Sequence, residues 1–146
     1  MSSCTMSLTL NRPFDETVNA VREQLSAVGL EIFTELDLQA TLKRKLDVDV
    51  APQVIIGAHR PQLAHRTIGV EPLRTPFLPC DVVVRALAEF TTIVEAFDPE
   101  IMTSHRLCGA DGPADAEIRA VATDARKRLC AALAAVGRTP AGLKPV

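Results

Sequence analysis

The thiol of Cys80 and the cationic side chains that could lie near it have the clearest chemical potential in this sequence. A thiol becomes a nucleophile when a neighbouring imidazolium or guanidinium stabilises its thiolate, and His59, His65 and Arg66 are the candidates for that role. The alternative interpretation is a small, buried and unreactive thiol that follows a proline. Two histidines, one cysteine and one aspartate could also bind a metal, but no spacing demands it, so we expect no metal and no other cofactor.

Any such site must be assembled by the fold, because the sequence has none of the familiar local motifs of nucleotide, zinc or hydrolase sites. If the first three strands run the same way and the fourth runs against the third, polar strand ends gather at one edge of the sheet. Side chains from the helix after the third strand could lean toward that edge. We therefore predict one polar ligand-binding pocket, lined by Asp37, Gln39, His59, His65, Arg66 and Cys80.

The elements that must position these residues follow from hydrophobic periodicity and from helix and turn signals. Strands are predicted over residues 5–10, 30–36, 53–58, 81–88 and 91–97, the last two as a hairpin that turns near Glu89 and Phe90. Helices are predicted over residues 15–28, 38–46, 61–69 and 113–136. Asp37 is the expected N-cap of the second helix, and Gly29 is expected to end the first in a left-handed conformation.

A length of 146 residues suits one domain, with a core over about residues 5–137 and a loose tail over 138–146. The fold class that we predict is α+β. It has a mixed sheet of about five strands, two long helices packed on one face, and short helices at the edge. A sheet with one covered face leaves its other face for a ligand or a partner subunit.

Composition argues against several classes of partner. The net charge is −2, and five Phe are the only aromatic residues, so we expect no nucleic-acid binding by the basic residues Lys43, Arg44, Lys45, Arg126, Lys127 and Arg128. The longest apolar run, Cys130 to Val136, is too short to cross a membrane. Four cysteines without a Cys-x-x-Cys pair and the lack of a signal-like start predict reduced thiols in a cytoplasmic protein.

The run TELDLQATLKRKLDVDVAPQVIIGAHRPQLAHRTIGVEP, followed by LPCDVVVR and AFDP, resembles the DUF302 family of small prokaryotic domains. The resemblance covers roughly residues 14–100, and it implies an α+β domain with a curved sheet and a homodimeric assembly. The family typically shows Cys and Asn where this chain has His59 and Arg60. That departure removes a second thiol and leaves Cys80 as the lone thiol that matches the family.

The function that we predict is a homodimeric, non-enzymatic module that binds a small molecule or a protein through the polar pocket around Cys80. This hypothesis is favoured because no set of nucleophile, base and orienting group is visible in the sequence. The alternative is a thiol-dependent sulfur or redox enzyme, or a carrier, in which Cys80 is the reactive group.

Overall fold

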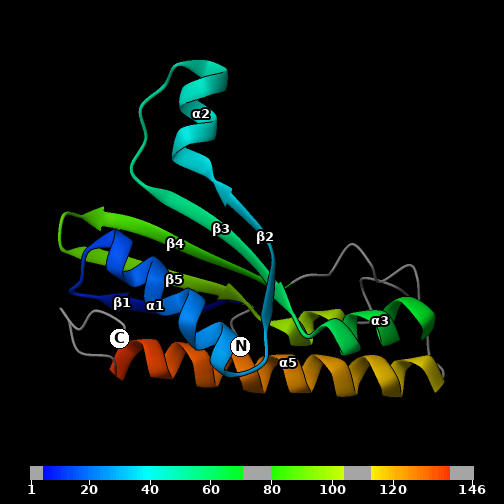
Figure 1. Ribbon diagram of the computed structural model, residues 1–146. Coiled ribbons are helices and arrows are strands. Elements are labelled where there is room, and N and C mark those ends of the chain that lie inside the picture. Colours follow the sequence, from blue (N-terminus) through cyan, green and yellow to red (C-terminus); the bar gives the residue numbers. More distant parts are fainter. Residues whose placement is uncertain (1–4, 71–79, 104–112, 139–146) are drawn as a thin grey trace.

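A five-stranded sheet forms the centre of the computed structural model, which describes residues 5–70, 80–103 and 113–138 (Figure 1). The strands are β1 (Thr5–Leu10), β2 (Glu31–Asp37), β3 (Gln53–His59), β4 (Cys80–Ala88) and β5 (Thr91–Phe97). Their order across the sheet is β1-β5-β4-β3-β2. Every neighbouring pair is antiparallel, so β1, β2 and β4 run one way and β3 and β5 run the other.

The α+β class is confirmed, but the predicted mixed sheet is wrong, because every neighbouring pair is antiparallel. The condition that the first three strands run the same way is not met. β1 and β2 do run the same way, yet they form opposite edges of the sheet. Parallel neighbours require a crossover helix that packs across the sheet. The helix between β2 and β3 has no buried residue, so it does not serve as a crossover, and β3 returns antiparallel beside β2. The antiparallel pairing of β3 with β4 and the β4–β5 hairpin are confirmed.

Two long helices, α1 (Phe14–Ala27) and α5 (Pro113–Arg138), cover one face of the sheet, as predicted. They share one hydrophobic core with β3, β4 and β5, which contribute Val, Ile and Ala side chains. From α1 the core takes Val18, Val21 and Leu25, and from α5 it takes Ala125, Leu129, Ala132 and Val136. Gly29, with φ of 81°, ends α1 in the left-handed region, and this prediction is also confirmed.

The short helices are α2 (Leu38–Leu46) and α3 (Pro61–Val70), and a 3-10 helix, η2 (Pro99–Thr103), follows β5. Asp37 caps α2 as predicted, because its Oδ1 accepts a hydrogen bond of 2.9 Å from the backbone N–H of Ala40. α3 packs against α5 beyond the end of the sheet. None of the helices in the described ranges is both long enough and apolar enough to cross a bilayer.

The segment of residues 31–52, which we call the arm, forms one edge of the molecule. It consists of β2, which pairs with β3 at the edge of the sheet, α2 and the linker to β3. Helix α2 stands well away from the layer formed by α1 and α5 (Figure 1). All seven residues of β2 are exposed, and no residue of α2 is buried. The arm therefore receives little support from the core of its own chain.

The sheet face opposite α1 and α5, which we call the open face, carries an apolar strip. The register places Leu36, Ile55 and Val83 side by side on β2, β3 and β4. Their neighbours along the strands belong to the core face, because successive side chains of a strand alternate between the two faces. Leu36 lies at the base of the arm, so the strip and the arm form one continuous surface.

Candidate functional site

The predicted pocket residues fall into two groups at opposite ends of β3. Asp37 pairs with Val54 near the start of that strand, whereas His59 is its last residue. At about 3.3 Å per residue, the two ends are separated by roughly 17 Å. Asp37 and Gln39 therefore lie far from His59, because β3 runs antiparallel to β2 and the end of β2 lies beside the start of β3.

The first group, Asp37 and Gln39, lies at the base of the arm. The Nε2 atom of Gln39 donates a hydrogen bond of 3.1 Å to the backbone carbonyl of Val50, which ties α2 to the linker that follows it. Asp37 serves as the helix cap described above. Both polar side chains thus contribute to the local structure of the arm.

The second group lies around the end of β3 and the start of α3. His65 and Arg66 are in the second turn of α3, and Arg66 forms an ion pair with Glu117 of α5. Cys80 is the first residue of β4 and the register partner of Ala58, so its backbone lies beside the end of β3. The side chain of Cys80 is outside the described part of the structure, and its reactivity stays a prediction.

His59 is buried, and one of its ring nitrogens has no partner. Its Nδ1 lies 3.2 Å from the backbone carbonyl of Arg60, and since a carbonyl only accepts, Nδ1 carries the proton of this bond. Nε2 is then a bare acceptor when the ring is neutral, and it has no partner among the described residues. Burial lowers the pKa of His59, although the hydrogen bond to the Arg60 carbonyl and the nearby carboxylate of Asp124 partly oppose the shift.

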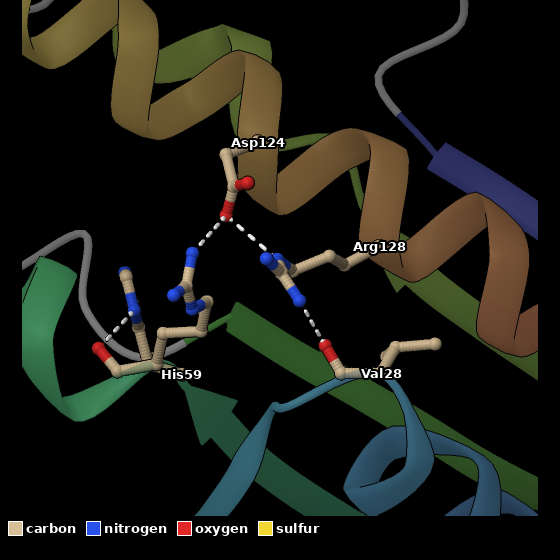
Figure 2. Close-up of polar contacts among 5 residues, drawn as sticks. Val28, His59, Asp124 and Arg128 are labelled. Carbon is tan, nitrogen blue, oxygen red and sulfur yellow. Dashed lines mark hydrogen bonds and ion pairs between the residues drawn. The ribbon is translucent and has the colours of Figure 1, made fainter.

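A polar network beside His59 joins three elements (Figure 2). The Oδ2 atom of Asp124 in α5 accepts from Arg128 Nε at 2.8 Å and from Arg60 Nη1 at 3.4 Å. Nη1 of Arg128 also donates to the carbonyl of Val28, which would otherwise lack a donor at the end of α1. The network therefore ties the ends of α1 and β3 to the middle of α5.

Asp124 is the carboxylate that pairs with both arginines of this network, Arg60 and Arg128. Burial raises the pKa of its carboxyl, but hydrogen bonds and charges from Arg128 and Arg60 outweigh burial and lower the pKa below its ordinary value. Sequence reasoning missed Asp124, and it treated Arg128 only as a basic surface residue. Their i, i+4 spacing on one helix was the available signal for the pair.

Ion pairs within the chain also neutralise some of the six basic residues that were considered for nucleic-acid binding. Arg126 lies 3.1 Å from Asp98, and Lys43 lies 2.9 Å from Asp47. With Arg128 held by Asp124, three of the six basic residues named above have carboxylate partners within the chain.

Replacing Arg128 by leucine is expected to lower the free energy of unfolding by about 1–2 kcal/mol, because the Val28 carbonyl and the Asp124 carboxylate each lose a donor. Urea denaturation followed by far-ultraviolet circular dichroism measures this loss. The control is Arg22→Leu, which removes an exposed ion pair with Glu35 and should cost less than about 1 kcal/mol. Equal losses in the two variants would show that the network adds nothing beyond a surface ion pair.

A groove of about 300 Å³ lies between α1, β2 and β3, at the base of the arm. This volume is at the lower end of the range for small-molecule sites. Arg22 bridges one side of the groove, donating to Glu35 Oε2 at 3.1 Å and to Asn19 Oδ1 at 2.9 Å. Its lining residues are Phe14, Asp15, Val18, Asn19, Arg22, Glu35, Asp37 and Val54. Asp37 is the residue that the groove shares with the predicted pocket.

Neither candidate location forms a metal centre within the part of the chain that the structure describes. No group of three or more His, Cys, Asp or Glu side chains there could hold a metal ion. What these locations offer is hydrogen bonding and charge: a bare imidazole acceptor at the end of β3 and a polar groove beside the arm.

Comparison with known proteins identifies the family of this chain and a solved structure with a similar fold. The model of the family described as "Domain of unknown function DUF302" matches residues 6–136. Among solved structures, the chain is similar to the uncharacterized conserved protein DUF302 from Bacillus stearothermophilus, with 24% identity and a TM-score of 0.76. The match covers 92% of this chain and 99% of that chain, and it shows the shared fold. The search of curated proteins found no match.

Proposed function

The chain belongs to the DUF302 family, and we propose that it is a non-enzymatic binding module that works as a homodimer. The family description names no activity, so the proposal depends on the surface of this molecule. The observation that carries it is the exposed arm, in which every residue of β2 is exposed and no residue of α2 is buried. A segment with so little internal support is typical of a surface that is completed by a partner.

The arm also holds most of the exposed large apolar side chains of the described residues. Of their ten exposed large apolar side chains, six belong to the arm: Ile32, Phe33, Leu36, Leu46, Val48 and Val50. Apolar side chains scattered singly over a surface need no explanation, but a concentration in one segment marks an interaction site. Leaving these side chains in water costs free energy that burial against a partner would recover.

The positions of the polar residues support the non-enzymatic part of the proposal. A reactive thiolate at Cys80 would need a cation beside it, yet His59, at the adjacent strand end, is biased toward its neutral form by burial. Arg66 is already paired with Glu117. The thiol-dependent alternative therefore gains no support from these cationic side chains.

Sedimentation velocity on the purified full-length chain tests the homodimer. We expect a species of twice the 15.7 kDa chain mass that dissociates on dilution. A protein that stays at the mass of one chain at the highest concentration reached would refute the proposed assembly.

Small-molecule binding is a second candidate function, favoured by the groove between α1 and β2. Native mass spectrometry of protein purified from its own host would detect a retained molecule. Asn19→Trp places a large ring at the groove from an exposed position of α1, so it should abolish retention without disturbing the core. A molecule retained equally by both proteins would exclude the groove as its site, and no retained molecule in either would count against this second function.

A further inference from the structure

We propose that the arm of one copy lies on the open face of a second copy, so that two chains exchange arms around a two-fold axis. This inference rests on the proposed homodimer and specifies which two surfaces meet. In an isologous dimer each contact is made twice, so one surface that includes both the arm and the open face can complete itself.

The apolar surfaces of the two regions are continuous. Leu36 at the base of the arm adjoins Ile55 and Val83 on the open face. The next row of the sheet adds Ile93 of β5, which is the register partner of Arg85. The long helices of the described residues lie on the other face (Figure 1). In this strip Leu36 is exposed, whereas Ile55, Val83 and Ile93 are half-buried. A partner that covers the arm but not the strip would leave part of the apolar surface in water.

The arm as a whole is acidic, with five carboxylates against three cations. Its helix α2 is basic, however, and the opposite charges of α2 and the open face favour a second copy over an unrelated partner. Helix α2 contains three basic residues and no acidic one. Lys43 is paired with Asp47 and Asp49, whereas Arg44 and Lys45 have no partner among the described residues. Two basic side chains of the arm therefore remain available for carboxylates on the facing surface.

The open face supplies those carboxylates. Asp81 is the register partner of Gly57 and lies on the same face as Val83, and it has no partner in the described part of the chain. Desolvation raises the pKa of Asp81, so an external cation would stabilise its charged form. Glu95 lies on the same face, 2.7 Å from Arg85. The open face thus carries two carboxylates and one guanidinium in this area, against two unpaired cations on the arm.

Pairing of two β2 edges is a less suitable assembly. The register of β2 shifts between Ile32 and Thr34, which marks a bulge, and Glu31 and Glu35 place two negative charges on this edge strand. Bulges and charges are the features by which edge strands avoid joining another sheet. The arm is therefore expected to meet its partner through side chains rather than through a continued sheet.

The test compares dissociation constants from sedimentation velocity for the full-length chain and three variants. Leu46→Ser with Val48→Ser changes the arm, Ile93→Thr changes the open face, and Ile68→Ser changes an exposed apolar residue of α3 as the matched control. We expect the arm and face variants each to weaken the dimer at least about tenfold, since each removes buried apolar surface. The control should remain within about twofold of the parent.

Charge reversal gives an independent readout. Arg44→Glu with Lys45→Glu should weaken the dimer, and adding Asp81→Lys should restore part of the lost affinity. Thermal unfolding by circular dichroism of each variant distinguishes a lost contact from a lost fold. A parent chain that is monomeric refutes the homodimer itself. A dimeric parent that is unaffected by either the arm or the face variant refutes arm exchange and leaves the homodimer standing.

Discussion

Replacing Leu129 by alanine is expected to lower the free energy of unfolding by about 2–5 kcal/mol. Leu129 is fully buried in α5, within the core that joins both long helices to the sheet. Removing its side chain leaves a cavity that the surrounding strands can close only in part. The chain has no Trp and no Tyr, so urea denaturation is best followed by far-ultraviolet circular dichroism.

The matched control for this variant is Ile68→Ala. Ile68 is 47% exposed in α3, and its truncation should change the free energy of unfolding by less than about 1 kcal/mol. If Leu129→Ala cost no more than this control, the packing of α5 against the sheet would not be the main support of the fold.

The stability of the chain is expected to fall as the pH drops below about 6.5, because His59 is buried in its neutral form. The folded-state pKa of His59 is lowered, so between the folded and unfolded pKa values the unfolded chain binds a proton that the folded chain does not. The contribution of neutral His59 to stability is therefore fully present above its pKa in the unfolded state. It is lost as the pH falls toward its pKa in the folded state. The slope of this loss is at most about 1.4 kcal/mol per pH unit for one group.

Urea denaturation at several pH values between 7 and 5 measures this slope. His59→Gln should give a shallower slope than the parent chain, and His65→Gln, at an exposed position, is the control. The same slope in all three proteins would show that His59 does not govern the acid sensitivity.

The local elements could be predicted from the sequence because their signals are local. Asp37 before Leu38 marks the start of α2, and Gly29 marks the end of α1, through backbone preferences that need no tertiary information. The β4–β5 hairpin was predictable for the same reason, since two apolar strands flank a short turn. The family resemblance, confirmed over residues 6–136, agrees with these elements.

The strand directions and the candidate site were not predictable, because both depend on contacts between distant segments. The direction of β3 depends on whether α2 packs on the sheet or stands away from it. The spacing of Leu38, Leu42 and Leu46 in α2 is compatible with either arrangement. The wrong strand direction also affected the predicted site. That pocket required the strands that lead to Asp37 and His59 to end at the same side of the sheet. The contacts of Asp124 with Arg60 and of Arg128 with Val28 span 64 and 100 residues, respectively.

The pairing of β1 with β5 also constrains how this chain acquires its structure during synthesis. Thr5 is the partner of Phe97, and Leu10 is the partner of Thr92. Pairs so distant in the sequence form slowly, because a long loop must close before they gain any contact energy. On the ribosome β1 emerges before the other strands of this sheet, and it has no partner until β5 has been translated. We therefore expect β1 to be the last strand of the sheet to become protected from hydrogen exchange in a refolding experiment.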